Sequence, residues 1–342
     1  MKKIIKTAAY AVLGLTVIGC AKAVQAGPNE ANERYFNAWM ETNYPGVDPT
    51  GLGIYVIEEE EGTGAVVKED GYAFAEYVIS DLEGNISSYT DEETAKQLGT
   101  YKPSSYYGPK VLTTIESTIP VGLADAITGM KAGGRKKVII PSWLMTYTVY
   151  DTKEEYLEKA STGTNTIYDI RITGFTEDID KYQIGLIGDY LSENKDLFGG
   201  MTAADSLSIG FYYKQLKAPV DTASFAKDTT IYINYTGRLL DGTVFDTTDE
   251  KIAKDNGIYS ASRSYEPTRI NWGEKVDDIT LGSSKSSTIK GFAQTLWQMR
   301  AFEKGIGVFY SPLGYGYNGS GSSIPAYAPL TFEIEIVAEP ED

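Results

Sequence analysis

Histidine is absent from the 342 residues, and cysteine occurs once, at Cys20. Without histidine the chain lacks the commonest general base and the commonest metal ligand. Histidine triads, the HExxH zinc motif and histidine-ligated haem are therefore excluded. One cysteine cannot form a disulfide within the chain or a cysteine-based metal site. We expect neither a metal nor a cofactor.

Positive charge is also scarce, because 31 lysine and arginine residues face 47 aspartate and glutamate residues. The net charge is −16, and removing residues 1–19, which hold three lysines and no acid, makes it −19. Phosphate backbones are bound by basic residues. Nucleic acid is therefore not an expected partner.

The apolar run TAAYAVLGLTVIG has 13 residues, whereas a membrane-spanning helix needs about 20. Following MKKIIK, this run is typical of an export signal. Val17-Ile18-Gly19-Cys20 resembles the bacterial lipobox and predicts a lipid on Cys20. The chain is then expected at the cell envelope of a bacterium, lipid-anchored at the periplasmic face or the outer membrane. The alternative is cleavage after Val24-Gln25-Ala26, which gives a soluble secreted protein.

Two stretches, ANERYFNAWMETNY and DIDKYQIGLIGDYLSEN, have the apolar spacing of an amphipathic helix, and each precedes a β-rich block. The motifs of the two blocks follow in the same order at a period near 160 residues, which indicates a duplicated domain. Alternation at Ile231, Ile233 and Tyr235 predicts an antiparallel sheet with one buried face. A short helix near Phe292 to Met299 is expected to cover that face. The predicted class is α+β.

These patterns divide the chain into five segments. They are a lipoprotein signal peptide at 1–19, a lipidated tether and short helix at 20–48, a first β-rich domain at 49–177, a linker helix and leading strand at 178–227, and a second β-rich domain at 228–342.

The second block carries INYTGRLLDGTVFDTTDE, IKGFAQTLWQM, SPLGYG and IPAYAPLTFEIEI in that order. From Asp228 to Pro340 it resembles an FKBP-type peptidyl-prolyl cis-trans isomerase. The resemblance implies two FKBP-like domains, the first degenerate, each a half-wrapped antiparallel sheet around one short helix and each preceded by an N-terminal helix.

The resemblance also implies the site. Its catalytic residues fall on Tyr235, Phe245, Asp246, Ile289, Phe292, Tyr315 and Phe332, and a further substrate-binding residue is Ile324. By resemblance, the backbone N–H of Ile289 and the hydroxyl of Tyr315 hold the peptide carbonyls on either side of the proline. Asp246 is expected beside the rotating carbonyl, hydrogen-bonded to Tyr235.

The residue types suit this reaction. Rotation about the prolyl amide needs a site that holds the amide away from water, but no nucleophile or proton shuttle. Taken one at a time, Tyr235, Ile289 and Phe332 are also compatible with plain core packing. Asp246 is likewise compatible with a turn residue.

Three features depart from the family pattern. Phe292 stands where the family most often has tryptophan, so the aromatic floor is smaller and lacks the indole N–H. The connection of 34 residues from 247 to 280 is predicted to be an unusually long loop, and the sequence leaves open whether it covers or reshapes the rim of the site. SPLGYG is one residue shorter than the common version.

The first block keeps the scaffold motifs GMKAGGRKKVIIP and YDIRITGF but not the site. Tyr77 matches Tyr235, whereas Ser87-Ser88 replaces the Phe-Asp pair and Leu123 takes the floor position. We predict a domain without isomerase activity, serving as a spacer or as a dimerisation and client-binding surface.

Three functions remain open on the sequence. The first is an envelope-anchored isomerase that assists the folding of exported proteins. The second is a chaperone or peptide-binding lipoprotein without turnover, and the third is a glycan-binding surface lipoprotein. Expected partners are proline-containing segments of exported proteins and, through the lipid, a membrane. Macrolide-type ligands are implied by the resemblance.

Overall fold

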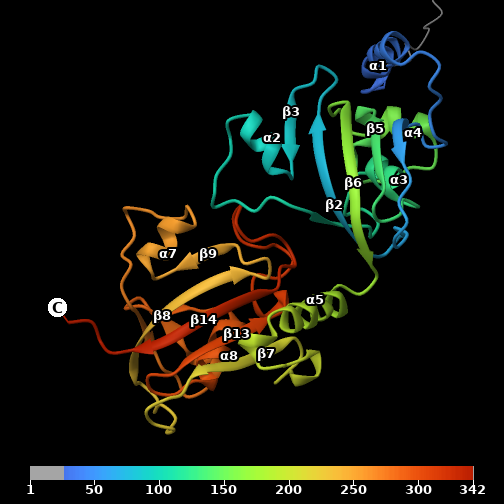
Figure 1. Cartoon of the computed structure of the whole chain (residues 1–342). Coiled ribbons are helices and arrows are strands. Elements are labelled where there is room, and N and C mark those ends of the chain that lie inside the picture. The colour runs from blue at the N-terminus through green and yellow to red at the C-terminus, as the bar shows by residue number, and fades with distance from the viewer. Residues whose placement is uncertain (1–26, 342) are drawn as a thin grey trace, which may run out of the picture.

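The computed structural model describes residues 27–341, which form two antiparallel sheets that follow one another along the chain (Figure 1). The predicted α+β class with two domains is thereby confirmed. The predicted signal peptide and Cys20 lie outside the described residues. Among the described residues, no helix has the length and apolar character needed to cross a bilayer.

The first domain holds a six-stranded sheet. Its strands are β1 (Tyr55–Glu60), β2 (Tyr72–Ser80), β3 (Ile86–Tyr89), β4 (Lys110–Thr113), β5 (Arg135–Ile140) and β6 (Thr166–Thr176). The order is β1-β5-β6-β2-β3, and β4 pairs with β2. The helices are α1 (Glu30–Asn43), α2 (Glu92–Gln97), α3 (Val121–Ile127), η1 (Ser142–Leu144) and α4 (Lys153–Lys159).

The second domain holds an eight-stranded sheet. Its strands are β7 (Phe211–Lys217), β8 (Thr230–Leu239), β9 (Val244–Thr247), β10 (Thr268–Asn271), β11 (Thr280–Leu281), β12 (Ser286–Ser287), β13 (Lys304–Phe309) and β14 (Leu330–Val337). The order is β12-β11-β10-β8-β14-β13-β7, and β9 pairs with β8. The helices are α5 (Ile179–Glu193), α6 (Lys195–Phe198), η2 (Ala203–Asp205), α7 (Glu250–Asp255), η3 (Val276–Asp278), α8 (Lys290–Gln298) and η4 (Ser311–Leu313).

The two sheets share one topology. Strands β1, β5, β6 and β2 are neighbours in the same order as β7, β13, β14 and β8. The backbone N–H of Tyr77 donates to the Thr90 hydroxyl at 2.9 Å, and that of Tyr235 donates to the Thr248 hydroxyl at the same distance. Both pairs are 13 residues apart in sequence, so the duplication extends to single hydrogen bonds.

Each sheet wraps around a short helix. In the second domain α8 buries Phe292 and Leu296 against the sheet, and Met299 follows at its C-terminal end. In the first domain α3 buries Leu123 and Ile127 in the same way. Burying such apolar side chains stabilises a fold by about 1.5 to 3 kcal/mol each, so each helix contributes to the core beneath its sheet.

The 34-residue connection differs from the unpaired loop that the sequence predicts. It contains α7 and β10, and β10 pairs with β8. The rings of Tyr259 and Tyr265 stack behind α7 with centroids 5.4 Å apart. The first domain repeats this arrangement, because Tyr101 and Tyr107 stack behind α2 at 5.6 Å. The segment is therefore part of the duplicated module.

The domains pack against each other at their junction. β6 ends at Thr176, and Tyr182 of the following helix α5 packs on Phe74 of β2 with ring centroids 4.5 Å apart. Tyr72 contacts Tyr327 of the second domain at 5.4 Å. Tyr106 of the first domain packs against the second domain's core. The leading strand β7 pairs with β13, so it lies in the second sheet.

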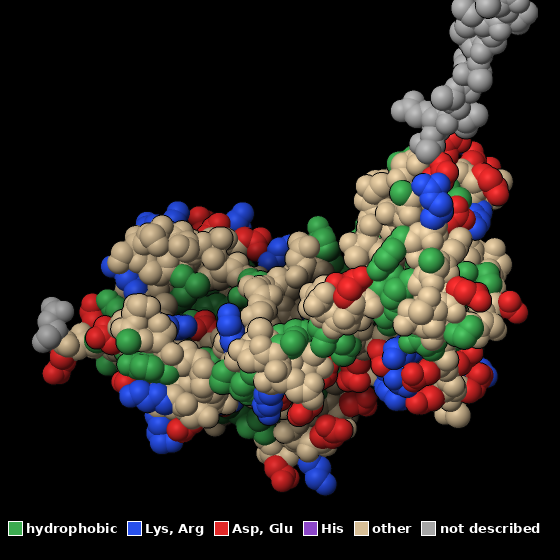
Figure 2. All heavy atoms as spheres, turned by 90° about the horizontal axis from the view of Figure 1, so that it is seen from above, with side chains coloured by type: hydrophobic (Ala, Val, Ile, Leu, Met, Phe, Trp, Pro, Cys, Tyr) green, Lys and Arg blue, Asp and Glu red, His purple; other side chains and the backbone are tan. Residues whose placement is uncertain are grey.

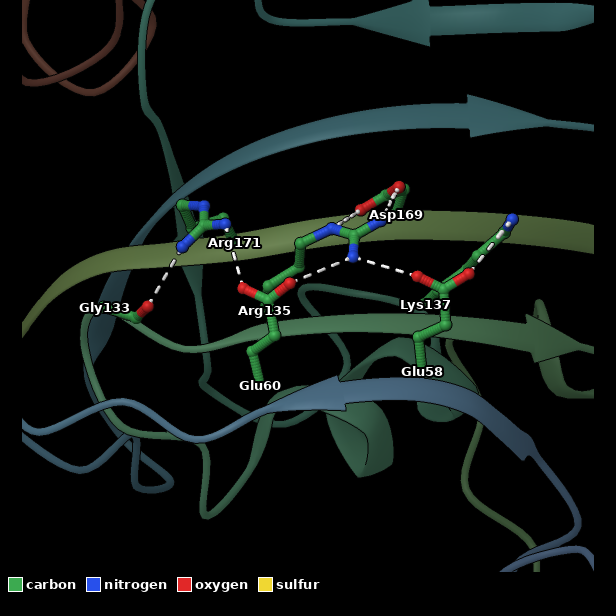
Figure 3. A network of polar contacts seen from close by, with 7 residues as sticks. All are labelled: Glu58, Glu60, Gly133, Arg135, Lys137, Asp169 and Arg171. Atoms are coloured by element: carbon green, nitrogen blue, oxygen red, sulfur yellow. Dashed lines mark hydrogen bonds and ion pairs between the residues drawn. The ribbon is translucent and has the colours of Figure 1, made fainter.

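An ion-pair network covers part of the first sheet (Figure 3). Arg135 donates two hydrogen bonds to the carboxylate of Asp169, at 2.7 and 2.6 Å, and one to Glu58 at 3.0 Å. Arg171 donates to Glu60 at 3.3 Å. Hydrogen bonding to Asp169 is the largest cause that raises the pKa of Arg135. The network links β1, β5 and β6, so it supports their register.

Arg135→Ala is expected to lower the free energy of unfolding by about 1 kcal/mol. A partly exposed bidentate ion pair with further partners contributes more to stability than an isolated pair on the surface. Denaturant unfolding followed by circular dichroism measures this loss. Arg34→Ala, which removes one exposed pair along α1, should have a smaller effect. Equal losses in the two variants would show that the network adds nothing.

Candidate active site

The hairpin of β8 and β9 places the predicted site residues. Asp241 and Gly242 form the turn, where Gly242 has a φ of 90° and Asp241 accepts the N–H of Thr243 at 2.8 Å. On β8, Gly237 lies opposite Asp246 of β9 on one side and Phe332 of β14 on the other. Glycine adopts a positive φ without strain, so the Asp-Gly pair favours this tight turn and with it the register of the two strands.

Four predicted aromatic residues form one cluster on the concave side of the sheet. The Phe332 ring lies 5.1 Å from Phe292, 5.5 Å from Phe245 and 6.1 Å from Tyr235, centroid to centroid. Phe292 and Phe332 are buried, whereas Phe245 and Tyr235 are partly exposed. In the view of Figure 2 the second domain is hollowed, with hydrophobic side chains in the hollow. The cluster therefore offers an apolar surface to a ligand.

A polar group of three side chains borders this cluster. The Tyr235 hydroxyl donates to Asp246 at 2.7 Å, which confirms the hydrogen bond predicted between them. Arg263 forms an ion pair with Asp246 and donates to the Tyr235 hydroxyl at 3.3 Å. Burial raises the pKa of Tyr235, and the Asp246 charge raises it further. The tyrosine therefore stays protonated and keeps Asp246 oriented.

The remaining predicted residues lie around the same cluster. Ile289 is the residue before α8, and no hydrogen bond within residues 27–341 uses its backbone N–H. Tyr315 is 36% exposed, and its pKa is raised by burial and then by the charge of Asp246. Ile324 is buried in the second core. A free backbone donor and a tyrosine hydroxyl are thus available to a bound peptide.

Arg263 is the site residue that the sequence does not predict. It comes 17 residues after Asp246, in the connection behind α7, among serines and tyrosines. Its spacing from Asp246 matches no regular element. The sequence shows only that basic residues occur in the long connection after Asp246. That observation does not distinguish Arg263 from Lys251 or Lys254 as the partner of Asp246.

The first domain keeps Tyr77 but lacks the acid, the floor aromatic and the free backbone donor. Ser88 lies opposite Ile79 in the register where Asp246 lies opposite Gly237. Leu123 is the third residue of α3, as Phe292 is of α8. The residue before α3 is Pro120, which has no N–H to donate. The predicted loss of the site therefore extends to the backbone donor.

Gly237 itself has a steric role. A Cβ atom at this position would lie 2.6 Å from the ring of Phe245 and 2.9 Å from that of Phe332. In the first domain the counterpart of Gly237 is Ile79, and the residue opposite it is Ser88. Glycine therefore lets both rings approach the sheet.

Gly237→Ala is expected to lower the free energy of unfolding by about 1 to 3 kcal/mol, the usual cost of overpacking. Gly185→Ala is the matched control, because nothing lies within 4 Å of its added methyl group in α5. That change should stabilise the protein by about 0.5 to 1 kcal/mol. Thermal unfolding of both variants provides the measurement, and a neutral Gly237→Ala would refute the steric role.

The second domain is similar in sequence to a family of known proteins. The model of the FKBP-type peptidyl-prolyl cis-trans isomerase family matches residues 222–337. FK506-binding protein 2 of Dictyostelium discoideum is 30% identical over 141 residues, which are 41% of this chain and 86% of that protein. FK506-binding protein 1A of Aspergillus fumigatus is 30% identical over 36% of this chain and 90% of its own length.

Two further relatives are covered less completely, and one solved structure aligns over most of this chain at low identity. The macrophage infectivity potentiator of Trypanosoma cruzi is 27% identical over 40% of this chain. The chain spans about half the length of this relative, 56%, and 41% of the isomerase FKBP11 of Bos taurus. The crystal structure of the three FKBP domains of wheat FKBP73 aligns over 85% of this chain and 97% of that chain, at 14% identity and a TM-score of 0.29. On its family match and on its 30% identity to relatives that it covers almost completely, the chain belongs to the FKBP-type peptidyl-prolyl cis-trans isomerase family.

Proposed function

We propose that the chain is a peptidyl-prolyl cis-trans isomerase whose active site is the aromatic cluster of the second domain. The observation that carries this proposal is the cluster of Tyr235, Phe245, Phe292 and Phe332 bordered by the hydrogen-bonded Asp246. An apolar surface with few oriented polar groups is the usual form of a small ligand site. A proline ring fits this description.

The chemistry that such a site performs is a rotation. The barrier about the amide is about 18 to 20 kcal/mol because the planar form has partial double-bond character. The twisted amide loses its charge separation, so an apolar surface without water disfavours the planar form more than the twisted one and lowers the barrier. The Ile289 N–H and the Tyr315 hydroxyl would hold the carbonyls of the flanking peptide bonds, so that one end stays fixed while the other turns.

Asp246 would lie beside the rotating carbonyl. Arg263 and Tyr235 would affect the charge and the orientation of its carboxylate. An unpaired carboxylate would repel a carbonyl oxygen and attract water into the site. The ion pair with Arg263 offsets that charge, while the bond from Tyr235 orients the carboxylate. Tyr235 belongs to β8 of the same hairpin, whereas Arg263 comes from the connection behind α7, so the position of Asp246 does not depend on the hairpin alone.

Asp246→Ala is expected to lower kcat/KM about 10- to 100-fold, since hydrogen bonds to a charged group contribute about 1.5 to 3 kcal/mol. Tyr235→Phe and Arg263→Ala should each lower it less, because each removes one partner of Asp246. A coupled assay with a short X-Pro peptide measures the rates of the full chain.

Asp189→Ala, an exposed aspartate on α5, is the control and should keep the parent rate. If the parent chain gives no rate above the uncatalysed reaction, the isomerase proposal fails and a peptide-binding protein without turnover takes its place. If the parent is active and all three variants keep its rate, the site is elsewhere.

We further propose that this isomerase acts on exported proteins at the envelope of a bacterium. Val17-Ile18-Gly19-Cys20 supports a lipid on Cys20 after removal of residues 1–19. The clients would be proline-containing segments of exported proteins, and macrolide-type ligands would compete for the aromatic cluster.

Cys20→Ser is expected to abolish lipid attachment and to move the protein from the detergent phase to the aqueous phase. Phase partition and labelling with a radioactive fatty acid measure this in the expressing cell. N-terminal sequencing supplies the opposing outcome, because a mature chain that begins at Gly27 would mean cleavage after Ala26 and no anchor.

A further inference from the structure

Part of the first domain's former site forms one side of a cleft between the domains. The interdomain cleft has a volume of about 770 Å³. Its first-domain side includes Tyr77 and Ser88, the counterparts of Tyr235 and Asp246, and its second-domain side includes Ser322 and Ile324. Ile324 is also a predicted substrate-binding residue. The cleft and the predicted site therefore share Ile324.

The second domain supports one wall of this cleft. The backbone N–H of Tyr106 donates to the carbonyl of Ser322 at 2.8 Å, and the Ser105 hydroxyl donates to that of Ser322 at 3.0 Å. Pro103 lies against Gly257, behind α7. The chain that leaves α2 thus meets the second domain in two places, which Figure 1 shows as the approach of this segment to α7. These contacts give the cleft a defined shape without a ligand.

The charge of the cleft is opposite to that of the protein. Its charged lining residues are Lys102 and Lys110, and it has no carboxylate in its lining. Both lysines are exposed, and neither forms an ion pair within residues 27–341. The carboxylates of Asp241 and Glu76 raise the pKa of Tyr106 after the effect of burial, but neither lines the cleft. In a chain with a net charge of −16, two unpaired lysines without acidic neighbours in the lining mark a place for an anion.

The exchange of Asp246 for serine in the first domain adds to this charge difference. Ser88 carries no charge, so the negative charge that Asp246 brings to the second domain is absent from this wall of the cleft. Tyrosines also dominate the rest of the wall, since Tyr77, Tyr89, Tyr106 and Tyr107 all line it. Aromatic and hydroxyl groups beside free cations suit an extended peptide that carries carboxylates.

We infer that the interdomain cleft is a second peptide-binding site, which takes an extended acidic segment of a client protein beside the isomerase site. The inference goes beyond the proposed function, because binding in this cleft requires neither a proline nor turnover. Lys102 and Lys110 attract the carboxylates, and the tyrosine wall contacts the peptide chain. The first domain then acts as a recognition domain for the second.

Fluorescence anisotropy with a labelled, proline-free peptide tests this binding on the full chain. The probe has about 12 residues, about 40 Å when extended, with glutamates among glycine, serine and leucine. Its counterpart has glutamine in place of every glutamate. The glutamate peptide is expected to bind about tenfold more tightly at an ionic strength of about 0.1 M, and the difference should shrink at about 1 M, where the screening length falls to about 3 Å.

The double variant Lys102→Glu with Lys110→Glu is expected to remove the preference for the glutamate peptide. Lys195→Glu with Lys227→Glu, at two exposed lysines outside the cleft, is the charge-matched control and should keep most of it. Ser88→Asp gives an independent reading, because it restores a carboxylate at the Asp246 position and should weaken binding without touching a lysine.

Equal binding of the two peptides would overturn the inference, as would a double variant and a Ser88→Asp variant that bind like the parent. A shift in oligomeric state on changing the lysines, measured by analytical ultracentrifugation without peptide, would instead identify a second copy of the chain as the occupant. None of these outcomes depends on isomerase activity, so the inference and the proposed function can fail separately.

Discussion

The antiparallel register around Gly237 is the constraint on which the site depends. This glycine lies opposite Asp246 on β9 and opposite Phe332 on β14. The acid and the aromatic ring therefore flank a position that has no side chain. Since a shift of one residue reverses the face of every side chain, the whole aromatic cluster depends on this pairing. The Asp241-Gly242 turn and the hydrogen bond from Tyr235 to Thr248 hold it in place.

The duplication separates what the scaffold needs from what the site needs. Both domains keep the strand order, the hydrogen bond between the tyrosine and the threonine, and the stacked tyrosine pair behind a short helix. These features bury apolar surface or pair backbone groups, which a folded domain requires with or without a ligand. The first domain differs in Ser88, Leu123 and Pro120, which fall at the counterparts of the acid, the floor and the free N–H.

The two domains act as one structure rather than as separate units. Tyr106 packs into the second core and holds the segment at Ser322, next to Ile324. A change in the first domain can therefore reach the rim of the proposed site through this contact. The counterpart of Ser105 in the second domain is Arg263, since the two segments repeat at the same interval as Tyr101 and Tyr259. One segment thus joins the domains, while its copy pairs with Asp246.

The sequence by itself determined the class, the duplication and the family, because apolar alternation and the order of motifs are properties of neighbouring residues. It also pointed to the bond between Tyr235 and Asp246, which lie on two strands joined by a short turn. Tertiary structure alone decided the pairing of Arg263 with Asp246, the place of β10 in the sheet and the cleft shared by Ser88 and Ile324. Each of these depends on where a long connection or a second domain comes to lie, and no local pattern encodes contacts between segments so far apart in the chain.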